Sequence, residues 1–240
     1  MQIFWITLYS SFAWSFLFIL VSNLVYLNIP KRNLWDFRNR IVSFVHGLYC
    51  IWFSTTEILH GTPFGAENTE FQEFVLSISL GYFLYDTICM FVLNIYDRSI
   101  ILHHTLVFSG VISGLATKTG GIEMTFGYFV AECTNPLLQI KESLKTLGQK
   151  DTLAFFYMEI IFILGYLLSR IGMGVPVIYY ILQSYQVILI ERITALSMEI
   201  MFCWWAKTMI IILKKRYNDH MTRKEKGIVL PWFVPFKKED

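Results

Sequence analysis

Apolar residues occur along this chain in long runs separated by short polar loops. A helix needs about 20 mostly apolar residues to cross a hydrocarbon core of roughly 30 Å, because it rises about 1.5 Å per residue. The pattern predicts seven such helices, at residues 4–27, 40–59, 74–93, 99–117, 122–141, 153–175 and 193–213. Residues 176–190 are apolar but interrupted by Pro176, Gln183 and Gln186. This stretch therefore extends the sixth helix, re-enters the membrane or forms an eighth span.

Basic residues mark one side of the predicted bundle. Lys31, Arg32 and Arg38 follow the first helix, and Lys145 and Lys150 follow the fifth. The seventh helix is also followed by a basic cluster, whereas the loop after the second helix has glutamates and no Lys or Arg. Seven alternating spans place every basic cluster on one side, and the positive-inside rule makes that side cytosolic. We therefore expect a lumenal or external N-terminus and a cytosolic C-terminus.

The composition supports a membrane protein. The chain is 55% hydrophobic and 16% charged, whereas a soluble domain carries about 25% charged residues. A nucleic-acid-binding protein is excluded, because no basic stripe with interleaved aromatic residues occurs outside the tail. The four cysteines lie in apolar segments without CxxC spacing, which indicates buried thiols rather than disulfides or a metal site. The predicted fold class is an all-α membrane protein with about seven transmembrane helices.

Ionisable and amide side chains inside the predicted helices are the candidate functional residues, because an unpaired charge in hydrocarbon costs several kcal/mol. The first set lies in the predicted cytosolic half of the bilayer, about 6–13 Å from the helix ends. Its members are His46, Asp86, His103, His104, Glu132, Asn135 and Glu159. A second set lies in the outer half: Glu57, Arg170 and Glu199. We interpret the second set as a structural ion pair or triad, since a buried arginine needs a carboxylate partner.

The adjacent histidines, His103 and His104, are the most informative members of the first set. Neighbouring residues of a helix point about 100° apart, so we expect one imidazole to face a central cavity and the other to hydrogen-bond a neighbouring helix. A carboxylate such as Asp86 or Glu132 could fix one imidazole as a base or nucleophile. A packing role is the alternative. A metal site is the weaker interpretation, because the HExxH spacing is absent.

Four segments in this order resemble the TLC-domain family of membrane proteins, which includes the ceramide synthases. They are GYFLYD (residues 81–86), ILHHTL (101–106), ECTNPLLQIKESL (132–144) and RIGMG (170–174). The resemblance implies a TLC-type helical barrel around a cavity that opens to the cytosolic side and laterally to lipid.

The resemblance also suggests how the chain is divided. We expect a first transmembrane helix with a basic cytosolic loop at residues 1–37, a TLC domain at 38–213 and a basic cytosolic tail at 214–240. The tail ends with Lys237 and Lys238 before two acidic residues, which resembles the dilysine retrieval signal of endoplasmic reticulum membrane proteins. The alternative for the tail is a basic anchor at anionic lipid. Residence in the endoplasmic reticulum is therefore expected over the plasma membrane.

Two functions follow as hypotheses. In the ceramide synthases the paired histidines are essential and one is implicated in acyl transfer from acyl-CoA, and His103 and His104 match that pair. Those enzymes also carry two aspartates three residues apart on the next helix, where this chain has Glu132 and Asn135. In the first hypothesis the protein binds, senses or moves a sphingolipid or acyl chain. In the second it is an acyl-CoA-dependent acyltransferase whose catalytic residues are His103, His104, Asp86 and Glu132.

In both hypotheses the remaining polar residues of the first set would line the cavity: His46, Asn135 and Glu159. No resident cofactor or metal is expected, and acyl-CoA would be a co-substrate of the enzyme. The expected partners are membrane lipids, with a homo-oligomer left open. A receptor or channel is a third class, which rests only on the number of spans.

Overall fold

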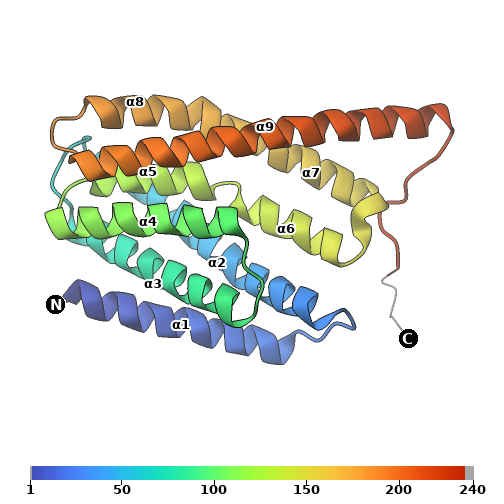
Figure 1. The fold of residues 1–240 in the computed structure, drawn as a ribbon, viewed down its shortest axis with the longest axis horizontal. Helices are drawn as coiled ribbons and strands as arrows, with labels where there is room; N and C mark the ends of the chain where they lie inside the picture. Colours follow the sequence, from blue (N-terminus) through green and yellow to red (C-terminus); the bar gives the residue numbers. More distant parts are fainter. Residues whose placement is uncertain (1, 236–240) are drawn as a thin grey trace.

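Most of the chain runs back and forth along one direction as antiparallel helices (Figure 1). The structure, a computed structural model, describes residues 2–235. The elements in chain order are α1 (Gln2–Leu24), α2 (Lys31–His60), α3 (Glu70–Val92), α4 (Arg98–Thr117), α5 (Gly121–Glu132), α6 (Asn135–Thr146), the short 3-10 helix η1 (Gln149–Asp151), α7 (Leu153–Tyr166), the π-helical segment η2 (Leu167–Gly174), α8 (Val175–Gln183) and α9 (Leu189–Glu225). The described residues contain no strand beyond an isolated bridge between Glu67 and Thr119.

Five helical segments of the described chain are long and apolar enough to cross a membrane, by length and composition. They are Gln2–Leu24, Glu70–Val92, Arg98–Thr117, Leu153–Gln183 and Leu189–Glu225. The predicted class, an all-α membrane protein, is therefore confirmed, whereas the count of seven spans stays a prediction. Helix α2 and the consecutive pair α5 and α6 run alongside these segments (Figure 1).

The predicted helix over residues 122–141 is wrong in its continuity, because the chain breaks it between α5 and α6. Pro136 is the cause: it lies in the first turn of α6, and it lacks the N–H that would continue the hydrogen-bond ladder. Residues 153–183, by contrast, are helical throughout, so the stretch from Pro176 extends the sixth predicted helix. The wider π turns of η2 lead into Pro176, and such turns accommodate an interrupted ladder.

The two ends of the bundle differ in the charged residues in and beside their loops: Glu67, Glu70 and Glu73 lie at one end, and Lys31, Arg32, Lys145 and Lys150 lie at the other. One end, which we call the acidic end, holds the N-terminus and the loops 61–69, 118–120 and 184–188 (left in Figure 1). The other, which we call the basic end, holds the loops 25–30, 93–97 and 147–152. This alternation agrees with the expected topology, and the orientation of the two ends across a membrane stays a prediction.

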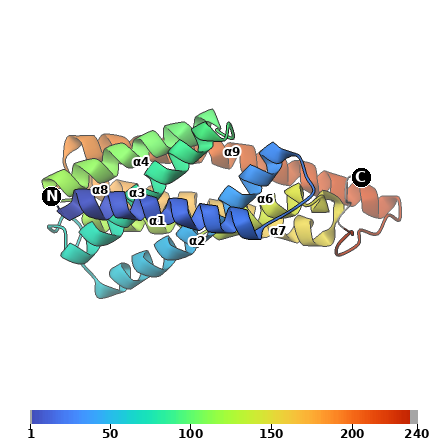
Figure 2. The same ribbon diagram turned by 90° about the horizontal axis from the view of Figure 1, so that it is seen from below.

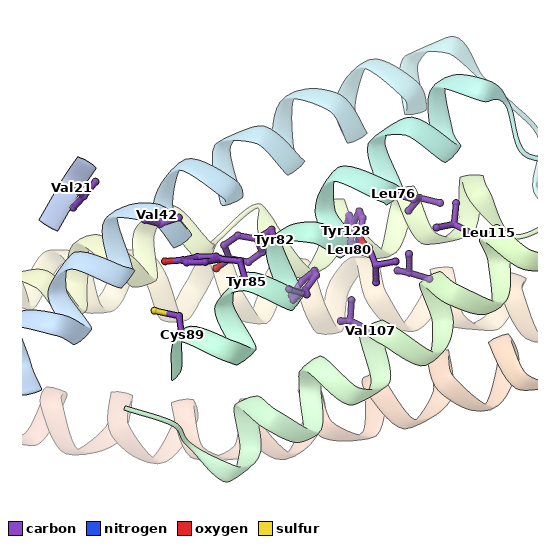
Figure 3. Close-up of a cluster of buried hydrophobic side chains, with 12 residues drawn as sticks. Val21, Val42, Leu76, Leu80, Tyr82, Tyr85, Cys89, Val107, Leu115 and Tyr128 are labelled. Carbon is purple, nitrogen blue, oxygen red and sulfur yellow. The ribbon is translucent and has the colours of Figure 1, made fainter. Parts of the chain in front are cut away.

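The main core lies where α2, α3, α4 and α5 meet. Figure 3 shows Val42, Tyr82, Val107 and Tyr128 pointing into it from these four helices. Helix α1 packs at the edge of the bundle (Figures 1 and 2). Its close contact with α3 depends on Gly81, because a Cβ atom there would lie 2.6 Å from the Cβ atom of Ser10.

The C-terminal region is more ordered than a basic tail beginning at residue 214 would suggest. Helix α9 continues to Glu225, and the chain then folds back against the start of α7. The amide of Leu153 donates to the carbonyl of Pro231 at 2.9 Å, and the side chain of Gln149 bonds both backbone groups of Val234. The predicted retrieval signal at Lys237 and Lys238 lies outside the described residues.

Candidate functional site

An apolar cavity of about 130 Å³ lies between α4, α5, α8 and α9. Aliphatic side chains and glycines form most of its wall, and Gly127 of α5 leaves open space there, because a Cβ atom would have no neighbour within 4 Å. The ionisable residues that reach the wall come from three helices: His103, Glu123, Glu132, Glu191 and Glu199. Glu123 and Glu132 are nine residues apart on α5, which corresponds to about 13 Å along the helix axis. The cavity therefore has polar groups near both of its ends.

The adjacent histidines of α4 point in different directions. His103 lines the cavity, and its Nδ1 atom lies 3.2 Å from the sulfur atom of Met198 on α9. His104 is buried against α3. Its Nδ1 atom lies 2.8 Å from the hydroxyl of Thr87, and its Nε2 atom lies 3.5 Å from a carboxylate oxygen of Asp86. The imidazole with a carboxylate neighbour is thus not the imidazole that lines the cavity.

Asp86 is held in place by α2. The side-chain amide of Asn39 donates to Asp86 at 2.6 Å, and the hydroxyl of Tyr85 donates to the amide oxygen of Asn39 at 2.7 Å. Tyr85, Asn39 and Asp86 are all buried. A buried polar network in which each group has partners fixes the relative positions of its helices, so this network orients His104 from α3.

A second polar chain leads from the basic end to the cavity through the break between α5 and α6. Arg40 donates to the side chain of Gln139 at 3.2 Å, and Gln139 donates to Asn135 at 2.7 Å. Asn135 in turn donates to the carboxylate of Glu132 at 2.7 Å. Asn135 therefore supports Glu132 and does not itself line the cavity. The close approach of α2 at this point needs Gly47, since a Cβ atom there would lie 3.1 Å from the Pro136 ring.

Arg170 stabilises the broken helix. Its guanidinium donates to the carbonyl of Ala131 and, at 2.6 Å, to the hydroxyl of Thr134. It also lies over the rings of Tyr166 and Phe202, at 4.5 and 5.4 Å from their centroids. These contacts satisfy backbone and side-chain groups that the break leaves without helical partners.

The predicted triad of Glu57, Arg170 and Glu199 does not form direct ion pairs in the described residues. Among the described residues, no ion pair joins Arg170 to either carboxylate. Glu57 instead accepts hydrogen bonds from Gln72 at 2.7 Å and from Thr62 at 3.0 Å. Carbonyl, hydroxyl and aromatic groups take the place of the carboxylate that the sequence reasoning required.

Two further residues that were expected in the cavity lie elsewhere. His46 is fully buried and stacks on Tyr82, with 3.6 Å between the ring centroids. Glu159 forms an ion pair with Arg216 of α9. Neither residue lines the cavity, because aromatic packing and a basic partner hold them in other parts of the bundle.

Glu123 and Glu191 were missed by the sequence reasoning. Both line the cavity near the acidic end. The available signal was a single glutamate inside each of the apolar segments GIEMTF and ILIERI. The described residues also contain no group of three or more His, Cys, Asp or Glu side chains arranged to hold a metal ion.

Long apolar helices that surround an apolar cavity define the class, which is a multi-pass membrane protein of helical fold. A family model described as the TLC domain matches residues 31–214. The chain belongs to the TLC-domain family, whose membrane proteins serve lipid metabolism and homeostasis. The match begins at the first residue of α2 and ends within α9, so α1 lies outside it.

Proposed function

We propose that this protein binds the chain of a membrane lipid in the cavity between α4, α5, α8 and α9, and thereby serves sphingolipid or acyl-chain homeostasis without catalysis. The observation that carries the proposal is the cavity itself, with an apolar wall and ionisable groups near its two ends. Ligand sites are commonly apolar concavities with a few polar groups that fix orientation.

The bilayer makes these polar groups important. A lipid chain that leaves the bilayer for the cavity gains no hydrophobic energy, because lipid tails are as apolar as the cavity wall. Selectivity must therefore come from the fit of the chain and from the groups at the ends, such as His103 and Glu132. The loop charges support a cytosolic basic end and a lumenal acidic end, and we place the protein in the endoplasmic reticulum membrane.

A second candidate function is acyl transfer from acyl-CoA. His104 supports it, because this imidazole lies between Thr87 and the carboxylate of Asp86, as an oriented base or nucleophile would. An imidazole nitrogen would attack the thioester carbonyl, the C–S bond would break, and CoA would leave as a thiolate. An amine or hydroxyl of the acceptor would then take the acyl group and give up its proton.

The geometry favours lipid binding over this reaction. His104 does not line the cavity, whereas His103 lines it and has a thioether rather than a carboxylate beside its Nδ1 atom. Acyl transfer needs the acyl carbonyl and the oriented imidazole in one place. The CoA phosphates would have to reach the basic end, where Lys145, Lys150 and Lys215 surround a surface hollow.

The test compares wild-type protein with the His103→Ala/His104→Ala double variant after purification. Copurified lipids are identified by mass spectrometry, and intact-protein masses are recorded after incubation with acyl-CoA. Lipid bound to both proteins, with neither an acyl adduct nor CoA release, is the expected result. An adduct or CoA release that needs the histidines would establish the acyltransferase instead.

A further inference from the structure

Two buried glutamates at the acidic end each have one carboxylate oxygen without a partner. Glu123 and Glu191 are only 4% and 5% exposed. Glu123 Oε1 accepts a hydrogen bond from the amide of Gly65 at 2.5 Å. Glu191 Oε1 accepts bonds of 3.4 and 3.3 Å from the hydroxyls of Ser113 and Thr117. In both residues the Oε2 atom is buried and has no hydrogen-bond partner.

No basic side chain of the described residues pairs with either glutamate. Arg192 is close in sequence to Glu191, but its guanidinium donates to the carbonyls of Val187 and Ser184. Lys118 is exposed. A buried carboxylate with an unused oxygen is costly, so the pair needs a positively charged or hydrogen-bond-donating group from outside the chain.

The fold keeps both carboxylates in the cavity wall. Each glutamate lies in the first turn of its helix, α5 or α9, where the helix dipole favours a negative charge. Gly120 makes room for Glu191, because a Cβ atom on this glycine would lie 2.8 Å from Glu191 Oε2. Both side chains line the same cavity as His103.

The loop at residues 61–69 closes the acidic end. Phe64 packs against Phe126 and Tyr180, with centroid distances of 5.1 and 6.2 Å. Asn68 donates to the carbonyl of Gly114 at 2.8 Å and accepts from the amide of Gly121 at 2.7 Å. A polar group held by the two glutamates would thus be shielded from water, which strengthens a charge-assisted hydrogen bond.

We propose that Glu123 and Glu191 form a binding site for the ammonium group of an amine-bearing lipid, whose chain extends along the cavity toward His103. The inference rests on the proposed lipid-binding function and names the headgroup. A primary ammonium has three N–H donors, which is enough to supply one to each free carboxylate oxygen. The cavity wall at this end includes Met124, Ile181 and Val187.

Two other cations fit the site less well. A quaternary ammonium has no N–H to donate, and it is usually held by aromatic rings, whereas the wall residues Met124, Ile181 and Val187 are aliphatic or thioether side chains. Calcium takes about six to eight oxygen ligands, and the two free oxygens are too few for it. A primary amine on a single chain is therefore the ligand that the geometry fits.

The experiment uses full-length protein in lipid nanodiscs and three ligands that share one alkyl chain: octadecylamine, octadecanol and octadecyltrimethylammonium. Native mass spectrometry gives the relative affinities at neutral pH. We expect octadecylamine to bind at least about tenfold more tightly than the other two ligands. The Glu123→Gln/Glu191→Gln variant should lose this preference and still bind octadecanol. Glu67→Gln/Glu70→Gln, which removes two exposed glutamates at the same end, is the matched control and should keep the preference.

The possible outcomes are separable. If wild-type protein binds the amine and the alcohol equally, or binds the trimethyl compound as well as the amine, the ammonium site is wrong while lipid binding stands. An amine preference that survives in the Glu123→Gln/Glu191→Gln variant also contradicts it. If none of the three ligands binds, the proposed function itself fails. The wild-type comparison needs no variant, so it decides the question even if the double variant does not fold.

Discussion

Filling the cavity at Gly127 should weaken lipid binding without weakening the fold. The Gly127→Leu change puts an isobutyl group into space where a Cβ atom has no neighbour within 4 Å. The cavity measures only about 130 Å³, which is room for a short stretch of a lipid chain, so that stretch and the new side chain would overlap. Overpacking costs about 1–3 kcal/mol, which corresponds to a loss of roughly 5- to 150-fold in affinity. The empty protein should gain about 1 kcal/mol, because leucine favours a helix interior over glycine.

Octadecanol binding in nanodiscs and thermal unfolding in detergent measure these two effects. Gly172→Leu is the matched control: Gly172 is exposed on η2, where a Cβ atom would meet only Leu168 at 3.4 Å. The control should leave affinity unchanged. Unchanged affinity in Gly127→Leu would refute the placement of the ligand in this cavity. A fall in both affinity and melting temperature would show that the site is already filled by protein.

Three further predictions concern stability. Gly47→Leu should cost about 1–3 kcal/mol and lower the melting temperature, because a Cβ atom would already be 3.1 Å from Pro136; an unchanged value would contradict the packing. Asp97→Ala should cost about 1 kcal/mol, since Asp97 caps α4. The hydrogen bond from the Ser99 side chain lowers the pKa of Asp97. The stabilisation by Asp97 is therefore complete above the ordinary aspartate pKa and is lost as the pH falls through the lowered pKa. Unfolding of the wild type and of Asp97→Ala, compared from neutral to acidic pH, measures this loss. Arg170→Leu should leave a carbonyl and a hydroxyl at the helix break without a donor, at about 1–3 kcal/mol each, and a melting temperature equal to that of the wild type would contradict this role.

Much of the fold was predictable from the sequence, because membrane helices have a strong compositional signal. The runs of apolar residues located α1, α3, α4, α7 and α9 correctly. The break in the helix predicted over 122–141 was harder to foresee. Pro136 indicated a kink, but a full interruption is tolerated only because Arg170, distant in sequence, donates to the groups that it frees. A single sequence does not show such a tertiary contact.

The candidate site was predictable in part for the same reason. Neighbouring residues of a helix point about 100° apart. The adjacency of the two histidines therefore predicted that one would line the cavity, as His103 does, and that the other would contact a neighbouring helix, as His104 does. The depth of a polar residue does not give its direction, however. His46 and Glu159 lie on faces that pack against Tyr82 and Arg216, so they do not line the cavity.

The expectation of a buried arginine–carboxylate pair overlooked other partners. The two terminal nitrogens of Arg170 donate to a carbonyl and two hydroxyls, and the guanidinium lies over two aromatic rings. Conversely, Glu123 and Glu191 lie near predicted helix ends, where a glutamate is ordinary and draws no attention. These two glutamates are distinguished only by the packing of α5 and α9 around one cavity and by the carboxylate oxygen that each leaves without a partner.

Photo-crosslinking most directly tests the central claim that a lipid chain occupies this cavity. A long-chain alcohol with a diazirine in the middle of its chain would be irradiated with the protein in nanodiscs, and the labelled residues would be mapped by peptide mass spectrometry. We expect labels on cavity-lining positions, such as Val111, Ala131 and Met198, which unlabelled octadecanol competes away and Gly127→Leu removes. Labels confined to lipid-exposed positions, such as Phe12 and Phe16 of α1, without competition, would contradict the account.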